Sequence, residues 1–286
     1  MHGNGATNHD CRTGICKHNE NTDIITWRGE VWMVHRTAES QMLGPNSALH
    51  IYRLQGTSFV ETARIPAPSD RDFRDPHLYV VGDTLRVKAL ARLSVVSVRD
   101  SDVDTVALGS GSADGVSAET PLETELVPMP SGRLMALVRT DGNDDEILGD
   151  LGPAHLRTVV CWAQPPYASF DCPQTLEGVR LDGPLVFFWR DRLLSIARKH
   201  LGADGRKRTA VYEFGGTLDG GPLTIREWGE LPSAGDTSYA GAAALPDGRL
   251  IATWYAGDLG ADDTWFLGMY AATDIWQAII DPGKLK

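Results

Sequence analysis

The chain has 286 residues, of which 42% are hydrophobic and 23% are charged, a composition typical of a globular protein rather than a disordered, fibrous or membrane protein. With 27 basic and 38 acidic residues the net charge is −11, which excludes a general electrostatic attraction to nucleic acid or to an anionic membrane surface. No window approaches about 18 uninterrupted apolar residues, so no membrane-spanning helix is expected.

The N-terminal segment is polar and rich in Gly, Asn and His, and it lacks the apolar stretch of a signal peptide. It is compatible with a mature end exposed after signal removal. The four cysteines fall into two close pairs, Cys11/Cys16 and Cys161/Cys172. An even number in local pairs predicts two disulfide loops and a secreted or periplasmic protein; the alternative is four free thiols in the cytosol.

One pattern recurs five times along the chain: an apolar run, a tight polar turn and an alternating apolar strand. Each copy is typical of a β-hairpin with Gly or Asp at its turn. The hairpins are expected at residues 24–36, 78–92, 126–139, 185–198 and 242–255. The first apolar residues after the turns are separated by 54, 49, 59 and 57 positions, and they are Val31, Leu85, Leu134, Leu193 and Leu250. This interval is the length of one four-stranded propeller blade.

Weaker strand patterns lie between the hairpins and would supply the outer strands, for example at residues 47–54 and 58–65. No ten-residue amphipathic helix is evident, and residues 273–281 fit either one helical turn or a closing strand. We therefore expect an all-β chain that forms a five-bladed β-propeller, as a single domain over residues 1–286. Residues 1–18 would be an N-terminal extension that is either a loop or part of the last blade.

In a propeller, the start of each innermost strand and the end of the following strand lie at the same end of the central channel. Eleven residues before the five anchors stand Glu20, Arg74, Glu123, Asp182 and Tyr239. Five residues after the anchors stand Arg36, Leu90, Arg139, Arg198 and Tyr255. This register predicts ionisable groups gathered at one end of the channel, as in many functional sites. Such arginines can also simply pair with carboxylates of the next blade.

The first two blades supply candidate acidic residues at their strand starts. Glu20 and Asp23 are equally good candidates in the first blade. Before the second hairpin, Pro76 fixes an extended entry that presents Arg74 and Asp75 toward the channel. Asp75 is a candidate general acid or base, or else the partner of Arg74 in a salt bridge at the turn.

Two further acidic groups follow in chain order. Asp100, Asp102 and Asp104 alternate in one loop, whose oxygens are a weak calcium candidate or else a solvated acidic edge. Glu123 and Glu125 flank the start of the third blade, where the register favours Glu123. Apart from the possible calcium, no cofactor is expected.

Four segments resemble the sialidase-like and neighbouring glycosidase propellers. DTSYAGAAALPDGRLIATWYAG is similar to the segment that holds the tyrosine nucleophile of sialidases, which maps onto Tyr239. LLSIARKH is similar to a strand ending in a substrate arginine, here Arg198, and SADGVS resembles a degraded Asp-box. FRDPHLY resembles the entry strands of five-bladed furanosidases and fructosidases.

The resemblance implies a secreted, exo-acting glycoside hydrolase whose substrate carries a carboxylate, such as a sialic, ulosonic or uronic acid. Tyr239 would be the nucleophile, activated by Glu123 or Glu20, and Asp75 the general acid/base. Guanidinium groups would clamp the substrate carboxylate. The residues expected to bind this sugar substrate are Glu20, Asp23, Arg36, Arg74, Arg139, Asp182, Arg198, Asp236 and Tyr255.

Three alternatives remain open. One is an arabinan- or fructan-type glycosidase that uses Asp23, Asp75 or Asp182 with Glu123 and no tyrosine nucleophile. The others are a non-catalytic glycan-binding propeller and a uronate lyase. The substitution Tyr239→Phe discriminates the sialidase-like tyrosine mechanism from the arabinan- or fructan-type mechanism. A glycan or small sugar acid is the expected partner, and the sequence leaves the oligomeric state open.

Overall fold

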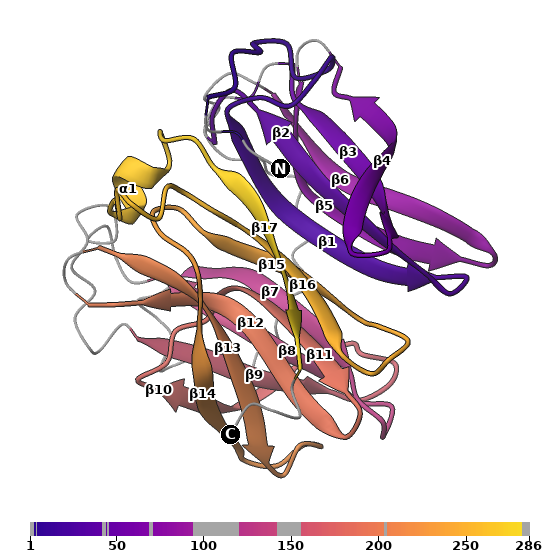
Figure 1. Ribbon diagram of the computed structural model, residues 1–286. Coiled ribbons are helices and arrows are strands. Elements are labelled where there is room, and N and C mark those ends of the chain that lie inside the picture. The colour runs from indigo at the N-terminus through magenta and orange to yellow at the C-terminus, as the bar shows by residue number, and fades with distance from the viewer. Residues whose placement is uncertain are drawn as a thin grey trace. The chain divides into compact units, whose positions relative to one another are not determined.

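The computed structural model describes residues 3, 5–41, 44, 46–68, 71–93, 120–141, 156–202 and 205–281. Over these ranges the regular structure is almost entirely β (Figure 1). The helix found there, α1 (Trp265–Gly268), is a single turn that Thr264 caps at its N-terminus. Within the same ranges, no helix is long and apolar enough to cross a membrane.

The strands form antiparallel sheets whose order follows the chain, as expected for consecutive propeller blades. The first sheet contains β1 (His18–Trp27), β2 (Glu30–Ala38), β3 (Ala48–Gln55) and β4 (Ser58–Pro66). The second contains β5 (Arg71–Val81) and β6 (Thr84–Leu93). The third contains β7 (Thr120–Pro128), β8 (Leu134–Asp141), β9 (Arg157–Ala163) and β10 (Asp171–Glu177).

Two more sheets complete the described part of the chain. The fourth contains β11 (Asp182–Trp189), β12 (Arg192–His200), β13 (Lys207–Gly216) and β14 (Leu223–Leu231). The fifth contains β15 (Ser238–Ala244), β16 (Leu250–Ala256) and β17 (Asp274–Ile280). All five predicted hairpins and the predicted outer strands β3 and β4 are therefore confirmed. The C-terminal segment that fitted either a helix or a strand is the strand β17.

The strands belong to two compact units. The first, residues 1–98 with 232–286, holds β1 to β6, β15 to β17 and α1. The second, residues 99–231, holds β7 to β14. A single domain over residues 1–286 stays a prediction.

The described residues before β1 form a loop, one of the two alternatives expected for the N-terminal extension. The loop is attached to the beginning of β17. The backbone N–H of Gly3 donates to Asp274 Oδ1 at 2.7 Å, and the N–H of Thr273 donates to the carbonyl of Lys17 at 3.1 Å. The first and fifth sheets are thereby joined through residues from both ends of the chain.

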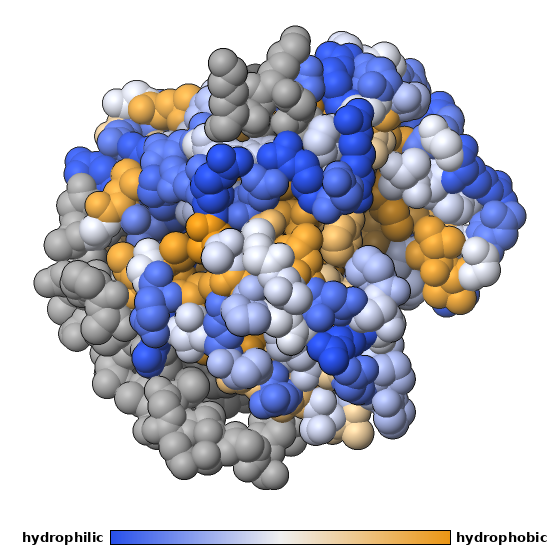
Figure 2. All heavy atoms as spheres, turned by 90° about the horizontal axis from the view of Figure 1, so that it is seen from below, coloured by the Kyte–Doolittle hydropathy of each residue, from blue (hydrophilic) through white to orange (hydrophobic). Residues whose placement is uncertain are grey.

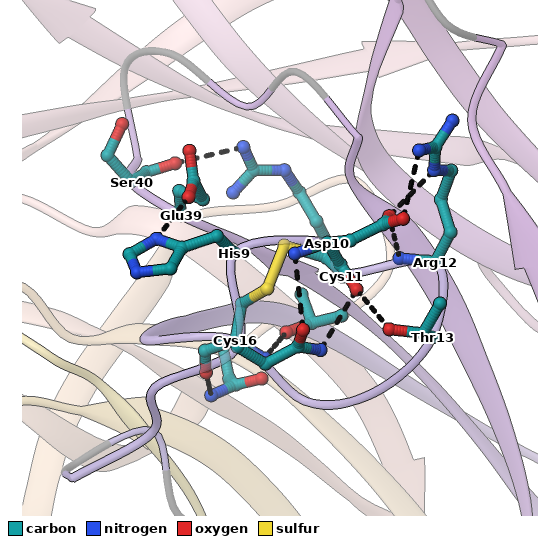
Figure 3. Close-up of a disulfide and its surroundings, with 12 residues drawn as sticks. His9, Asp10, Cys11, Arg12, Thr13, Cys16, Glu39 and Ser40 are labelled. Carbon is teal, nitrogen blue, oxygen red and sulfur yellow. Dashed lines mark hydrogen bonds and ion pairs between the residues drawn. A yellow bond between two sulfur atoms is a disulfide. The ribbon is translucent and has the colours of Figure 1, made fainter.

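Both predicted disulfides are present, Cys11–Cys16 and Cys161–Cys172. Figure 3 shows the first of them, which closes a short loop just before β1. The backbone N–H of Cys16 donates to Thr37 Oγ1 at 2.9 Å, so this loop is also held against the end of β2.

Each unit has its own apolar core, built from the inward side of the alternating strands. In the first unit the core includes Met33, Tyr52, Ile251 and Tyr255. In the second it includes Met135, Leu137, Leu181, Leu193 and Phe214. On the face seen in Figure 2, polar groups are interspersed with smaller apolar ones, which is ordinary for a water-exposed surface.

Candidate functional site

A β-bulge recurs near the start of the innermost strand of every sheet. The registers of β1, β5, β7, β11 and β15 against their partners shift within a few residues of the strand start. In four of them a residue at the shift has left-handed backbone, and these residues are Asn21 (φ 54°), Asp75 (φ 45°), Gly183 (φ 50°) and Tyr239 (φ 43°). Bulges re-aim side chains, and non-glycine residues held at positive φ cluster at functional sites.

The predicted register is correct in three sheets and one residue out in two. Glu20 pairs with Arg36 and Asp182 with Arg198, as expected, and Arg74 pairs with Leu90. In the other two sheets the partners are Leu122 with Arg139 and Ser238 with Tyr255. Glu123 and Tyr239 therefore occupy the bulge, the position that Asn21 and Asp75 occupy in their own sheets.

The one-residue shift in these two sheets comes from the length of the turn. In the β7–β8 and β15–β16 hairpins the last pairs are Pro128 with Leu134 and Ala244 with Leu250, six positions apart. The corresponding pair in the first hairpin is Thr26 with Val31, five positions apart. One more residue in the turn moves every count along the strand by one.

Asp75 does not form the alternative salt bridge with Arg74. Its Oδ1 accepts a hydrogen bond from the side-chain amide of Asn21, the bulge residue of the neighbouring sheet. Arg74 donates to Asp72 Oδ2 at 2.8 Å and to the carbonyl of Gln41. Asp75 is partly exposed, so this carboxylate stands between two strand starts and within reach of a ligand.

Asp23 is the second partly exposed carboxylate at these strand starts. Its Oδ1 accepts from its neighbour's backbone N–H, that of Ile24, at 2.9 Å, and its Oδ2 accepts from the N–H of Leu78 in β5 at 2.7 Å. The ring of His77 lies 3.8 Å from the same oxygen. The side chain is thus fixed in orientation by two backbone donors.

Tyr239 and Tyr255 form a stacked pair with ring centroids 6.2 Å apart. Tyr239 is half-buried, whereas Tyr255 is fully buried in the apolar core of the first unit. Full burial does not favour the expected contact of Tyr255 with substrate, and that role stays a prediction.

Arg36 lies at the centre of a buried ionic network in the first unit. Its Nε and Nη2 donate to both oxygens of Asp72, at 2.9 and 2.8 Å, and its Nη1 donates to Glu20 Oε1. Arg74 lies 3.7 Å from the same oxygen of Glu20. The Arg36 side chain is fully buried. It is therefore saturated by carboxylates of the protein, and the geometry does not favour a substrate clamp at this position.

Burial controls the protonation of this network. It raises the pKa of Glu20 to about 7, even though Arg36 and Arg74 oppose the shift. It also lowers the pKa of His18 well below its ordinary value, and the positive charges of Arg36 and Arg74 add to that effect. Asp236, a predicted binding residue, is buried beside this network and accepts a hydrogen bond from Trp265 Nε1 at 2.9 Å.

A second buried network lies in the second unit around Asp182. Its Oδ1 accepts from Arg180 at 2.7 Å and pairs with Arg139 at 3.1 Å, and its Oδ2 accepts from His200 Nε2 at 2.7 Å. Burial alone would raise the pKa of Asp182, but these cationic and donor groups hold it well below its ordinary value. Arg198, in the same region of β12, is also buried.

Several members of these networks were missed by sequence reasoning, namely His18, Asp72, Arg180, His200 and Lys207, whose Nζ contacts His200 Nδ1. Strand alternation carried a signal for three of them, because side chains two positions apart share a face of a strand. His18 stands two residues before Glu20, Asp72 two before Arg74, and His200 two after Arg198.

Some predicted residues cannot be placed. Asp100, Asp102 and Asp104, the weak calcium candidates, lie outside the described residues. Glu123 is placed in β7 by its backbone alone. Their predicted roles stay predictions.

No protein-family model matches the chain, and no curated protein matches it. Solved structures do. A GH32 β-fructofuranosidase from Bombyx mori has a TM-score of 0.53 at 10% identity, over 91% of this chain and 60% of that one. A glycoside hydrolase family 43 arabinoxylan arabinofuranohydrolase from Bacillus subtilis, solved with cellotetraose, has a TM-score of 0.52 at 10% identity, over 92% and 63%.

A third match is a thermostable family-43 glycoside hydrolase, with a TM-score of 0.52 at 8% identity over 94% of this chain and 92% of that one. The chain thus spans about three fifths of the length of the Bombyx mori and Bacillus subtilis enzymes. At these identities the likeness shows the fold alone. This chain has the all-β, five-bladed β-propeller fold of the GH32 and GH43 glycoside hydrolases, as predicted. A specifically sialidase-like character gains no support from these structures.

Proposed function

We propose that the protein is a glycoside hydrolase that acts on a furanoside or pentose-containing glycan, of the arabinan or fructan type, through paired carboxylates. The observation that carries this proposal is Asp75, a partly exposed carboxylate held at positive φ in a bulge and hydrogen-bonded by Asn21. A carboxylate fixed in this way is suited to general acid/base catalysis.

The solved structures support this choice of substrate class over a sialic acid. Two of the matched structures are a β-fructofuranosidase and an arabinoxylan arabinofuranohydrolase. The arginines expected to clamp a sugar acid are occupied instead. Arg36 is bound by Glu20 and Asp72, and Arg139 by Asp182.

Glycoside hydrolysis of this type needs a second carboxylate, and three are available. Asp23 is partly exposed and oriented by two backbone donors. Glu123 is at the bulge of β7 by register. Asp182 is fully buried among Arg139, Arg180 and His200, which suits a structural counter-ion better than a group that must reach substrate. We therefore favour Asp75 with Asp23.

The test is hydrolysis of arabinan, arabinoxylan, inulin, sucrose and an aryl sialoside by the wild-type chain and by matched variants. Asp75→Asn is expected to lower kcat about 10²–10⁴-fold on the active substrate. Asp23→Asn and Glu123→Gln identify the second catalytic carboxylate, because the variant that lacks it should show a comparable decrease in kcat. Asp83→Asn, an exposed carboxylate at the tip of the hairpin that contains Asp75, is the control and should leave kcat unchanged.

Retained activity in Asp75→Asn would overturn the proposal. Tyr239→Phe separates the paired-carboxylate mechanism from a tyrosine-nucleophile mechanism. Loss of the phenolic hydroxyl should spare most of the activity in the first mechanism and abolish it in the second. Cleavage of the sialoside alone would restore the sialidase-like hypothesis.

A non-catalytic glycan-binding propeller is the second candidate, and one observation favours it. The bulge of the first sheet holds Asn21, an amide, where the bulges of β5 and β7 hold Asp75 and Glu123. An amide cannot transfer a proton at neutral pH. Glycan binding without hydrolysis of any substrate in the panel would decide for this candidate.

We also propose that the protein is exported. The two disulfides support this, since such bonds persist in oxidising compartments. Expression with and without an export signal, followed by thiol counting, tests it: free thiols in the exported, active form would contradict it.

A further inference from the structure

His18, the first residue of β1, is fully buried, and neither of its ring nitrogens has a hydrogen-bond partner in the part of the chain that the structure describes. A buried polar side chain without a partner costs free energy and calls for an explanation, such as a bound ion. Glu20 lies two residues further along the strand, and its Oε2 is 3.6 Å from His18 Nδ1.

Asp236 brings a second carboxylate to the same place from the segment before β15. One ligand atom from each of His18, Glu20 and Asp236 lies within 4.8 Å of the other two, and all three residues are buried. Three convergent ligands of this kind are the usual number for a metal site that keeps one position for water.

The neighbouring side chains already orient both carboxylates. Arg36 donates to Oε1 of Glu20, and Oε2 is the oxygen that faces His18. Trp265 Nε1 donates to Oδ1 of Asp236 at 2.9 Å. Hydrogen bonds that hold the outer atoms of ligating side chains are the usual second layer of a protein metal site.

We propose that His18, Glu20 and Asp236 bind one divalent transition-metal cation, for which zinc is the best fit. One imidazole nitrogen with two carboxylate oxygens suits zinc, whereas calcium and magnesium take oxygen ligands. Ligands of a tetrahedral zinc lie about 3.4 Å apart. The 3.6 Å separation of His18 and Glu20 is already close to that value.

The charges of the surrounding network favour a cation. Its carboxylates are Glu20, Asp72 and Asp236, and its guanidinium groups are Arg36 and Arg74. Among these five side chains one negative charge is in excess. This excess makes the position between Glu20 and Asp236 electrostatically favourable for a cation.

The cation would cross-link the first and fifth sheets. It ties the start of β1 to the segment before β15, beside the point where Asn19 N–H donates to Thr273 Oγ1 at 2.8 Å. Because the tied positions lie near the two ends of the chain, binding is expected to stabilise the folded state. The site is distinct from the proposed catalytic pair Asp75 and Asp23.

The test uses the full chain after treatment with a chelator. Isothermal titration with Zn²⁺, Mn²⁺ and Ca²⁺, together with metal analysis after dialysis, should give one equivalent of zinc, bound more tightly than calcium. Zinc should also raise the Tm. Co²⁺ should quench the fluorescence of Trp265, because its indole donates to the ligand Asp236. This part of the quenching should be absent in the variant Trp265→Phe.

Three variants locate the site. His18→Gln and Asp236→Asn should each weaken zinc binding at least about 100-fold, and Trp265→Phe should weaken it about 10-fold. His35→Gln is the matched control, since His35 is an equally buried histidine in the first sheet whose ring contacts Tyr52. It should leave the affinity for zinc unchanged.

Sub-stoichiometric zinc in the wild-type chain would overturn the proposal, as would unchanged affinity in Asp236→Asn. Tighter binding of calcium than of zinc would overturn the choice of ligand chemistry. If His18→Gln does not fold, Asp236→Asn and the cobalt quenching of Trp265 decide. None of these readouts depends on hydrolytic activity.

Discussion

At the scale of single residues, the molecule buries several of its charged side chains, and it buries them in ionic networks. Arg36 is buried with two carboxylates around it, and Asp182 is buried with Arg139 and Arg180 around it. Taking such ions out of water is costly, and the close hydrogen-bonded pairing offsets that cost. Removing one member therefore leaves an uncompensated charge in the interior.

We expect Asp72→Asn to lower the free energy of unfolding by about 3 kcal/mol. Asp72 accepts from Arg36 at 2.8 and 2.9 Å and from Arg74 at 2.8 Å, so the substitution removes one of the two carboxylates around these guanidinium groups and leaves Glu20 to pair with both. Urea denaturation measures the change. Asp83→Asn, which breaks the exposed pair with Arg28, should give no measurable change, and equal effects would contradict this reasoning.

A buried histidine makes stability depend on pH. Burial, with a further contribution from His50, lowers the pKa of His35 to about 3. The unfolded chain binds this proton near pH 6.5. Between about pH 6.5 and pH 3 the unfolded state is therefore protonated here and the folded state is not. The free energy of unfolding falls with falling pH by up to ~1.4 kcal/mol per unit for this group.

His35→Gln should make this dependence shallower, as measured by urea denaturation at pH 7, 6 and 5. The comparison with wild type cancels other groups, including Glu20, whose raised pKa of about 7 acts in the opposite direction. Identical slopes for the two proteins would show that His35 titrates normally in the folded state.

Residue-scale predictions from sequence succeeded where alternation was regular. The pairing of Glu20 with Arg36 and of Asp182 with Arg198 followed from counting along the hairpins. Pairing of the arginines with carboxylates of the next blade was one of the alternatives, but the particular partners did not follow. Which carboxylate an arginine meets depends on the neighbouring sheet, as with Arg36 and Asp72, and counting within one hairpin carries no information about that.

At the scale of elements, the turns decide the register. Arg28 and Gly29, both at positive φ, close the first hairpin in two residues. The turns before Leu134 and Leu250 are one residue longer, and they displaced the predicted positions of Glu123 and Tyr239 by one. Strand existence was predictable because apolar alternation repeats. Exact register was not, because both turn lengths are compatible with Gly and Asp at the turn.

The close approach of β15 to β1 gives a prediction at this scale. A Cβ on Gly241 would lie 2.7 Å from the backbone nitrogen of Ile24 and 3.0 Å from the backbone carbon of Asp23. Backbone atoms cannot move aside cheaply, so Gly241→Ala should lower the Tm and cost about 1–3 kcal/mol. Gly260→Ala meets only the side chain of Asp258 and should be nearly neutral in the same thermal melt. A neutral Gly241→Ala would contradict this contact.

At the scale of the whole molecule, the repeat of about 55 residues was enough to predict the fold. Five hairpins at nearly constant spacing leave few other architectures for a chain without long helices. The function was less accessible, because a propeller carries its chemistry in a few side chains at its strand starts, and the segments that resemble sialidases are also turn and strand signals that any blade needs.

The two disulfides are expected to stabilise the fold by amounts that increase with the logarithm of the length of the loop that each closes. The Cys161–Cys172 bond spans 11 positions and the Cys11–Cys16 bond spans 5. Replacing both cysteines of the longer loop by Ala should cost about 3 kcal/mol, and of the shorter loop about 2 kcal/mol. Guanidinium unfolding of the two double variants measures this. The reverse order would show that strain or local contacts outweigh chain entropy.

The repeated bulge has a consequence for how such a chain can change. Positions 21, 75, 183 and 239 share one left-handed backbone but carry an amide, a carboxylate, hydrogen and a phenol. The backbone there is independent of the functional group it displays, so exchange among Asn, Asp and Gly at these sites alters the reactivity of the molecule at little conformational cost. Each sheet thus keeps the same bulge, and the side chain at that one position determines what chemistry the sheet can contribute.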